Sequence, residues 1–347
     1  MLGDQLFKKA VTFTDLHFGR SNNAPLCNQD NIGFLEWAID RAKAWGAETC
    51  LVLGDYFDNR HSCGLATLDA GLKGMEMISK AFEHVVWIPG NHDLMYRDKR
   101  DISSVVFARL FNNITFVTEP TTLGGCTVLP WLVGDEPREI REQLDSRYVF
   151  GHLELPGFLL NAKVPMPHHA NGITADDFIK PEYVFSGHFH FRQKQGRVVY
   201  TGNIMPFNFA DDWDEDRGMM LLEWGKDPIF EAWPDQPLFR TMKLSDMLSR
   251  PDFYLKPNMT VRASLDLPMT YEETMHLRDE FVKSHQLRKL ETVTIADPNS
   301  AKAAVKASSL ASDAAFQTVD QIVYKGLDTF ESHEIDSAFL KEIYASL

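Results

Sequence analysis

Short apolar runs alternate with amphipathic stretches over the first 130 residues. Residues 11–14, 50–53 and 84–88 are apolar runs with the length of buried strands. Between them, one helix is expected from Asn28 or Asp30 to Gly46 and another over residues 65–82. The residues expected on the inward face of the first helix are Ile32, Leu35, Trp37, Ile39 and Ala42. Strands that alternate with helices predict an α/β fold whose strands are buried between layers.

After residue 114 the expected strands are shorter, and fewer helices separate them. These strands occupy residues 114–117, 126–129, 148–150, 183–185, 197–201 and 219–224. The pattern predicts a second sheet packed on the first, which together form a layered sandwich. A domain boundary is expected over residues 225–237, because this stretch contains three prolines.

Residues 238–347 are expected to fold apart from this sandwich. A strand at 260–265, a helix at 271–285 and a strand at 292–295 predict a small α/β unit. Residues 296–315 are poor in large apolar side chains and indicate a linker. Residues 316–347 predict two short amphipathic helices, which need another surface to cover their apolar faces. That surface is either a partner protein or the second domain of this chain.

Composition narrows the class of protein. The chain has 347 residues, of which 44% are hydrophobic and 24% charged, as in soluble proteins of more than one domain. No apolar run approaches the ~20 residues of a membrane span, so a cytoplasmic protein without a membrane anchor is expected. The net charge of −14 disfavours a protein that coats nucleic acid by bulk electrostatics. It still allows a nuclease, because bound divalent cations attract phosphate locally.

Five of the expected strands run into a loop that carries aspartate, asparagine or histidine. The loop residues in question are Asp15, His17, Asp55, Asn91, His152, His188 and His190. Asp15 and His17 are expected to point to the same side if the chain stays extended through them. A single Asp-x-His is usually an ordinary strand end, but five such loops at one edge of a sheet favour a shared site.

These side chains offer oxygen and imidazole ligands without thiolate, which suits Mn²⁺, Fe or Zn²⁺. The four cysteines are irregularly spaced and contain no Cys-x-x-Cys pair, so neither a thiolate zinc site nor a disulfide framework is expected. Seven ligands are too many for one ion and about right for two. Asp55 is the candidate for the anionic bridge that two neighbouring cations require.

The motifs D-x-H, GDxxD, GNHD, GH and GHxH occur in this order and resemble the calcineurin-like metallophosphoesterase superfamily over residues 11–224. Within it, the chain is similar to the SbcD-type nuclease subunits of double-strand-break repair complexes, including those of T-even-type bacteriophages; "GHLELPGF" and "FSGHFH" carry this similarity. The resemblance implies a four-layer αββα sandwich over 1–237 and a small α+β DNA-capping domain over 238–295. It also implies a linker over 296–315 and a segment over 316–347 that binds a partner ATPase.

The resemblance also implies a role for each site residue. One Mn²⁺ would be held by Asp15, His17, Asp55 and His190, and the other by Asp55, Asn91, His152 and His188, with Mg²⁺ as a possible substitute. His92 would be the catalytic histidine, oriented by Asp58 or Asp93. One departure from the family pattern is "TGNIMPFN" at 201–208, where relatives have a glycine-serine/threonine-proline turn.

The function implied is a Mn²⁺-dependent DNA exo/endonuclease subunit that acts in recombination and double-strand-break repair. Its expected partners are DNA, an SMC-like coiled-coil ATPase of the SbcC type bound through 316–347, and a second copy of the chain, packed through the surface near 65–112. One alternative is a stand-alone phosphoesterase acting on nucleotides or phosphoproteins, which would not require residues 238–347. Another is a non-catalytic scaffold, which has no need to bury seven polar ligands together.

Overall fold

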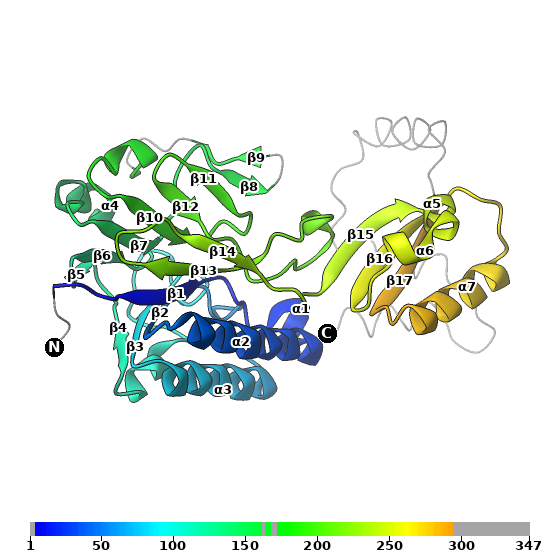
Figure 1. Cartoon of the computed structure of the whole chain (residues 1–347), viewed down its shortest axis with the longest axis horizontal. Coiled ribbons are helices and arrows are strands. Elements are labelled where there is room, and N and C mark those ends of the chain that lie inside the picture. Colours follow the sequence, from blue (N-terminus) through cyan, green and yellow to red (C-terminus); the bar gives the residue numbers. More distant parts are fainter. Residues whose placement is uncertain (1–3, 162–163, 168–171, 295–347) are drawn as a thin grey trace, which may run out of the picture. The chain divides into compact units, whose positions relative to one another are not determined.

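The computed structural model describes residues 4–161, 164–167 and 172–294 (Figure 1). The linker and the helices predicted over 296–347 lie outside these residues. The chain divides into two units, Met1–Val293 and Thr294–Leu347, and the architecture described below is that of the first.

The first sheet has six strands in the order β14-β13-β1-β2-β3-β4. Strands β1 to β4 pair in parallel, whereas β13 runs antiparallel to β1 and β14 antiparallel to β13. The strands are β1 (Lys9–Phe13), β2 (Thr49–Leu53), β3 (His84–Ile88), β4 (Ile114–Phe116), β13 (Gly218–Glu223) and β14 (Ile229–Ala232). Because β14 pairs with β13, the stretch expected to be a domain boundary contributes an edge strand to this sheet.

The second sheet also has six strands, in the order β11-β12-β10-β7-β6-β5. Its central strands β6, β7, β10 and β12 are parallel, and β5 and β11 pair antiparallel at the two edges. The strands are β5 (Thr121–Leu123), β6 (Cys126–Leu129), β7 (Tyr148–His152), β10 (Tyr183–Gly187), β11 (Gln193–Gln195) and β12 (Val198–Tyr200).

Side chains that alternate along each central strand build two cores. In β2, Cys50 and Val52 pack toward the helices, whereas Leu51 and Leu53 pack between the two sheets. The period of two places successive side chains on opposite faces, so a strand buried on both sides is apolar throughout. The uninterrupted apolar runs of the sequence therefore correspond to the centre of the sandwich.

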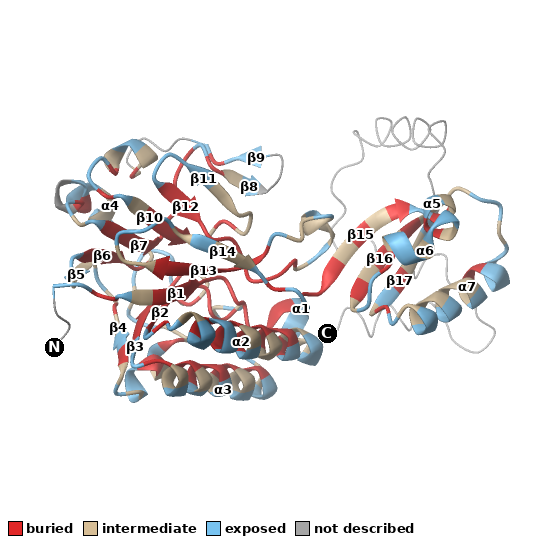
Figure 2. Cartoon of the chain, in the orientation of Figure 1, coloured by how far each residue is buried: buried red, intermediate tan, exposed pale blue. Residues whose placement is uncertain are grey.

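Two long helices, α2 (Pro25–Trp45) and α3 (Leu65–Ala81), cover the outer face of the first sheet (Figure 1). Figure 2 shows buried residues along their inner sides and exposed residues along their outer sides. Helix α2 begins earlier than expected because Pro25, which has no N–H to satisfy, occupies the first turn. It ends at Gly46, whose φ of 86° closes the helix as the sequence predicts.

The outer face of the second sheet is covered by short elements. These are α4 (Glu136–Glu139), the 3₁₀ segments η2 (Ile140–Gln143) and η3 (Ala175–Asp177), and the hairpin of β8 (Leu159–Asn161) and β9 (Val164–Pro165). They bury a third apolar core that includes Leu153, Phe158 and Tyr200. The expected αββα order of layers is confirmed, although the fourth layer holds no long helix in the described part of the chain.

Residues 238–294 form a small α+β unit with an apolar core of its own. Its sheet has the order β15-β16-β17, from β15 (Leu238–Lys243), β16 (Met259–Leu265) and β17 (Lys289–Thr294). Its helices are α5 (Leu244–Ser249), α6 (Pro251–Tyr254) and α7 (Tyr271–Ser284). The sequence pattern does not predict β15, because the buried Arg240 interrupts its alternation of apolar residues.

Short helical segments connect the remaining strands: α1 (Arg20–Asn23), η1 (Val106–Leu110) and η4 (Phe209–Asp211). All four cysteines are free thiols. Among the helices of the described residues, none has the length and apolar character needed to cross a membrane.

Candidate metal centre

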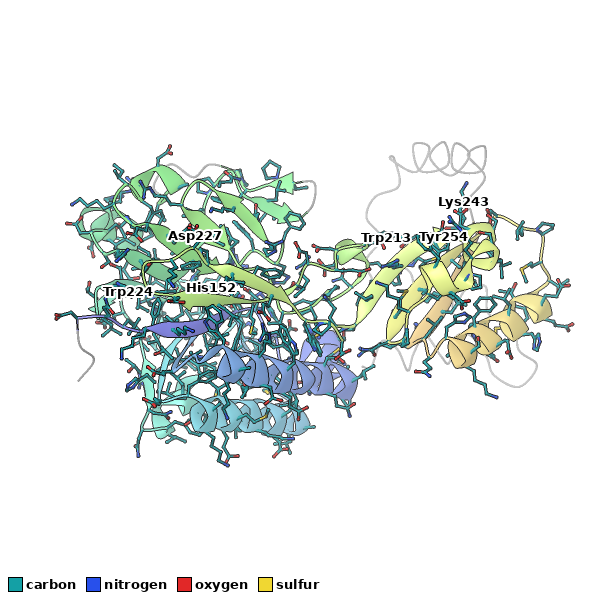
Figure 3. The ribbon with its side chains drawn as sticks, viewed as in Figure 1. His152, Trp213, Trp224, Asp227, Lys243 and Tyr254 are labelled. Carbon is teal, nitrogen blue, oxygen red and sulfur yellow. The ribbon has the colours of Figure 1, made fainter. Side chains whose placement is uncertain are left out.

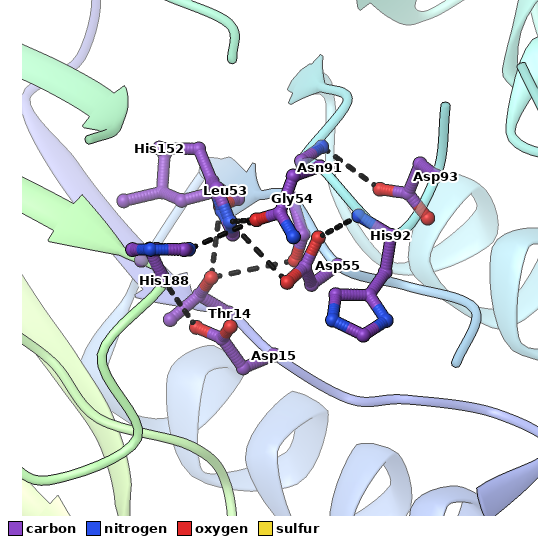
Figure 4. Close-up of polar contacts among 12 residues, drawn as sticks. Thr14, Asp15, Leu53, Gly54, Asp55, Asn91, His92, Asp93, His152 and His188 are labelled. Atoms are coloured by element: carbon purple, nitrogen blue, oxygen red, sulfur yellow. Dashed lines mark hydrogen bonds and ion pairs between the residues drawn. The ribbon is translucent and has the colours of Figure 1, made fainter. Parts of the chain in front are cut away.

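The side chains predicted as ligands lie at the carboxyl ends of parallel strands in both sheets. Strand β1 leads to Asp15 and His17, β2 to Asp55, and β3 to Asn91. From the second sheet, β7 ends at His152 (Figure 3), His188 directly follows β10, and His190 lies two residues beyond it. Figure 4 shows five of these side chains close together although they come from loops far apart in the sequence, namely Asp15, Asp55, Asn91, His152 and His188.

One group of three side chains consists of Asp15, His17 and His190. The Oδ1 atom of Asp15 lies 3.8 Å from Nε2 of His17 and 3.9 Å from Nε2 of His190. The two Nε2 atoms lie 3.2 Å apart, with nitrogen facing nitrogen. Since two imidazolium N–H groups would repel each other at this distance, the arrangement suits a shared cation or a single shared proton.

A second group consists of Asp55, His152 and His188, with Asn91 between them. The Oδ2 atom of Asp55 lies 3.3 Å from Nε2 of His152. The amide oxygen of Asn91 lies 3.1 Å from the same Nε2 and 2.9 Å from Nδ1 of His188. Two oxygens and two imidazole nitrogens thus converge, which is a donor set for a divalent transition-metal ion.

Asp55 lies between the two groups. Besides its contact with His152, its Oδ2 atom is 3.8 Å from Nε2 of His17 in the first group. Its other oxygen, Oδ1, accepts a hydrogen bond of 2.8 Å from the backbone N–H of His92. Asp55 is therefore placed where a carboxylate would bridge two cations.

Neighbouring acceptors fix the orientation of the imidazole rings. Nδ1 of His152 lies 2.7 Å from the carbonyl of Leu53, and Nδ1 of His17 lies 3.1 Å from a carboxylate oxygen of Asp58. When each Nδ1–H donates to these oxygens, Nε2 keeps its lone pair and faces the carboxylates at the centre. This is how ligating histidines are usually held.

Burial and neighbouring charges shift the pKa values of the aspartates and histidines in the site. Burial favours the neutral form of Asp55, but the positive charge of His152 and its hydrogen bond hold the pKa of the carboxyl well below its usual range. Burial also disfavours charged imidazoles, yet the carboxylates of Asp15 and Asp58 raise the pKa of His17 to about 10. Burial and the neighbouring charge of His17 lower the pKa of His190 to about 4.

The residues present fit divalent cations. Asp15 Oδ1 is buried and has no hydrogen-bond partner among the described residues. No lysine or arginine of the described residues forms an ion pair with Asp15 or Asp55. A cation would satisfy the orphaned oxygen and would take the imidazole lone pairs when the protons leave. Asp15 and Asp55 thus need positive charge that, within the described chain, only histidines supply.

His92 lies beside the first group, its ring centroid 4.8 Å from that of His17. Its Nδ1 atom lies 2.6 Å from the backbone carbonyl of Asp58, whereas the Asp58 carboxylate contacts His17. Of the two residues expected to orient His92, Asp58 therefore does so through its main chain. Burial and the charge of His17 lower the pKa of His92, although the charge of Asp55 opposes this.

Asp93, the other residue expected to orient His92, binds backbone N–H groups in the structure. Its carboxylate accepts hydrogen bonds from the backbone N–H groups of Tyr56, Phe57 and Gly90, at 2.9–3.0 Å. It therefore ties the loop after β2 to the loop after β3. Burial, together with the charge of Asp55, raises the pKa of Asp93 to about 7 despite these three donors.

The backbone at the ligands departs from the extended path expected for Asp-x-His. Strand β1 ends at Phe13, and both Asp15 and His17 have left-handed φ angles, of 55° and 51°. Asp55 and His188 are left-handed as well, with φ angles of 51° and 94°. Such angles are unfavourable for residues with a Cβ, and they tend to occur at functional sites, where the surrounding structure enforces them.

The Calcineurin-like phosphoesterase family matches residues 9–192, which is more than half of the chain and includes every candidate ligand. The chain belongs to the calcineurin-like phosphoesterase family. The predicted superfamily is thereby confirmed, and with it a metal-dependent phosphoesterase domain; members of this family use divalent metal ions.

A curated relative extends this similarity. Exonuclease subunit 1 of Enterobacteria phage T4 is 25% identical to the chain over 224 residues, which are 62% of this chain and 64% of that protein. The similarity thus spans less than two thirds of the relative's length.

Solved structures also align with the chain. TT1561 of Thermus thermophilus has a TM-score of 0.40 and 11% identity, covering 65% of this chain and 99% of that one. Yfce, a phosphoesterase from E. coli, has a TM-score of 0.34 and 13% identity, covering 66% and 94%. Nuclease MPE of Pseudomonas putida has a TM-score of 0.26 and 19% identity, covering 62% and 84%.

The loop that departs from the family pattern is anchored by a buried arginine that the sequence motifs do not reveal. Arg217 donates to the backbone carbonyl of His190 and to the side-chain oxygen of Asn203. It also donates to Asp214 at 2.7 Å and to Asp211 at 3.0 Å. Every nitrogen of the guanidinium is thus hydrogen-bonded, and the loop after β12 is tied to the backbone of a candidate ligand.

Two aromatic residues that pack against candidate ligands also lie outside the sequence motifs. The ring of Phe207 packs against those of His17 and His190, with centroids 5.6 Å and 5.3 Å apart. The ring of Trp131 lies 5.1 Å from that of His188. Neither residue belongs to a ligand motif, and an isolated aromatic residue in a loop carries no signal in a single sequence.

Replacing Arg217 is expected to lower both the stability of the fold and its affinity for cations. Arg217→Lys keeps the charge but loses the planar set of donors, so the His190 carbonyl and Asp211 lose contacts. We expect the free energy of unfolding to fall by about 1–3 kcal/mol and Mn²⁺ affinity to fall at the Asp15–His17–His190 group. Urea unfolding and Mn²⁺ titration followed by electron paramagnetic resonance measure the two effects.

Arg41→Lys is the matched control, because Arg41 forms an exposed two-bond ion pair with Glu231 away from the site. This control is expected to bind Mn²⁺ like the wild type. Wild-type Mn²⁺ binding by folded Arg217→Lys would show that Arg217 does not support His190.

Proposed function

We propose that this protein is a Mn²⁺-dependent DNA exo/endonuclease subunit that hydrolyses phosphodiester bonds at DNA ends. The observation that supports it most directly is the position of Asp55, between two groups of aspartate and histidine side chains and hydrogen-bonded to the backbone of His92. The similarity to a protein named exonuclease subunit 1 favours DNA as the substrate. The resemblance of its motifs to SbcD-type nuclease subunits supports recombination and double-strand-break repair as its setting.

In this proposal Asp15, His17, Asp55 and His190 hold one cation, and Asp55, Asn91, His152 and His188 hold the other. When bound, the cations supply positive charge for the phosphate oxygens and make the attacking water more acidic. The chain itself contributes rigid ligands on strained loops, which keep the two positions fixed relative to each other.

His92 is the proposed proton-transfer group. Because its Nδ1 is engaged by the carbonyl of Asp58, its Nε2 remains for the leaving oxygen of the scissile phosphate. Asp58 takes part indirectly, since its carbonyl holds His92 and its carboxylate holds His17. Asp93 supports Asp58 and His92 indirectly, because it accepts hydrogen bonds from the backbone of the loop that carries each of them.

The experiment that tests the activity compares substrates. Purified protein is incubated with linear duplex DNA, single-stranded DNA and methyl p-nitrophenyl phosphate, each with Mn²⁺, with Mg²⁺ and with EDTA. We expect Mn²⁺-dependent degradation of DNA and none in EDTA. Turnover of the small diester without degradation of either DNA would instead support a stand-alone phosphoesterase. If no substrate is hydrolysed, the chain is a scaffold and the proposal is wrong.

Removing the proposed proton-transfer group should separate turnover from cation binding. His92→Ala leaves all seven proposed ligands in place, so kcat is expected to fall by about 10²–10⁴-fold while Mn²⁺ content stays unchanged. Quench-flow kinetics and elemental analysis of the same sample measure both quantities. His61→Ala, which alters an exposed histidine, is the control. Loss of Mn²⁺ in proportion to activity would identify His92 as a ligand instead.

The proposal includes two protein partners: a coiled-coil ATPase of the SbcC type, bound through residues 316–347, and a second copy of the chain. Four exposed aliphatic side chains within 65–112 support the second contact, namely Leu65, Ile102, Val106 and Leu110. We expect a dimer in analytical ultracentrifugation, which Leu110→Glu converts to a monomer. Deleting 316–347 is expected to abolish co-purification with the ATPase and to preserve the dimer. A wild-type monomer, or ATPase binding by the deletion variant, would contradict the respective contact.

A further inference from the structure

A cavity of about 250 Å³ borders the candidate metal centre on the side of His152. Its lining is mostly apolar and comes from the loop after β6, helix α4, the end of β7 with the loop that follows it, and the segment before η3. The lining residues are Trp131, Leu132, Pro137, His152, Leu153, Glu154, Gly172 and Ile173. Because His152 both lines the cavity and lies 3.3 Å from Asp55, the cavity is next to the proposed cation positions.

The size and lining of the cavity restrict what it can hold. It is smaller than the roughly 300–1,000 Å³ of pockets that enclose a whole small-molecule ligand. It therefore suits part of a substrate whose remainder lies elsewhere. A phosphate or a sugar would leave its polar groups unpaired against Leu132, Leu153 and Ile173, whereas a flat, largely apolar ring would not.

Trp131 forms a rigid wall of this cavity. Its backbone N–H donates to the carbonyl of Pro89 at 3.1 Å, and its indole N–H donates to the carbonyl of Arg97 at 3.2 Å. Its own carbonyl accepts a hydrogen bond of 2.9 Å from Arg100, which is paired with Glu136. An aromatic ring held in this way loses little conformational entropy when another ring stacks on it.

Trp131 is also hydrogen-bonded to the loop that carries the candidate ligand Asn91. Pro89, the acceptor for Trp131, directly precedes the Gly90-Asn91-His92 segment. The indole lies 5.1 Å from the ring of His188 and 6.1 Å from that of His152, measured between centroids. One sugar ring separates a base from its phosphate, so a base in this cavity can belong to a nucleotide whose phosphate is on the cations.

We propose that this cavity is a base-binding subsite, in which a nucleobase next to the scissile phosphate leaves its helical stack and packs against Trp131. This inference rests on the proposed nuclease function and adds the form of the substrate. A base that is paired and stacked in a duplex cannot enter a pocket, so its unpairing has to precede cleavage. The preferred substrate is then single-stranded DNA or a frayed DNA end.

Dinucleotides that lack one base test the proposal without assuming a direction of digestion. The substrates are thymidylyl-thymidine and its two analogues in which an abasic deoxyribose replaces one of the nucleosides. We expect the wild type to lose about 10-fold or more in kcat/KM for one of the two analogues, as base–aromatic stacking requires. Trp131→Ala should cleave this analogue and the parent equally well, whereas Trp131→Phe should keep the preference.

Trp213→Ala is the matched control, because Trp213 is an exposed tryptophan that does not line the cavity. It is expected to keep the wild-type preference. Elemental analysis of each variant shows whether Mn²⁺ content is unchanged, which separates loss of the base contact from damage to the neighbouring His188. A Trp131→Ala protein that keeps the wild-type preference would overturn the proposal.

A measurement on the wild type alone remains decisive if Trp131→Ala does not fold. Thymidine 3′- and 5′-phosphates and the matching abasic deoxyribose phosphates are compared as inhibitors of methyl p-nitrophenyl phosphate turnover. We expect one thymidine phosphate to inhibit about 10-fold more strongly than its abasic counterpart. Equal inhibition and equal cleavage of all three dinucleotides would refute the subsite and leave the nuclease intact. Absence of hydrolysis of DNA, dinucleotides and the small diester would instead refute the nuclease function.

Discussion

The burial of Asp15 and Asp55 close to the same imidazoles is the constraint on which the rest of the structure depends. Two carboxylates in a water-poor centre are unfavourable unless positive charge compensates them. Among the described residues this charge comes from histidines, whose protons a divalent cation can replace. The fold thus gathers these carboxylates and imidazoles at a site suited to cations, and the family to which the chain belongs uses divalent metal ions.

This constraint explains features that are unfavourable when taken alone. Left-handed backbone at Asp15, His17 and Asp55 turns the chain sharply where parallel strands end, so that both sheets deliver ligands to one point. Glycines allow the two sheets to approach each other there. At Gly187 a Cβ atom would lie 2.6 Å from the carbonyl of Leu53, so a larger residue would separate the loops. Asp93 and Arg217 then hold these loops with side-chain hydrogen bonds to the backbone.

Much of the fold could be predicted from the sequence because its signals are local. Strands such as β3 and β6 consist mainly of buried apolar residues, and their predicted bounds agree with the structure. Four of the seven candidate ligands directly follow a glycine near a strand end, so the sequence alone marks them as candidates. By contrast, β14 and β15 lie near prolines and contain polar residues, so their own sequences give a weak strand signal, and each is held as a strand by pairing with β13 or β16. The roles of Trp131 and Arg217 depend entirely on contacts made after folding, which no local pattern encodes.

Anomalous diffraction from crystals soaked in Mn²⁺ tests the central claim most directly, since it counts the ions and locates them. Two peaks roughly 3.5–4 Å apart are predicted, one on each side of Asp55, with Asp15, His17 and His190 around one peak and Asn91, His152 and His188 around the other. A single peak that excludes Asp55, or no peak among these side chains, would contradict the two-cation account.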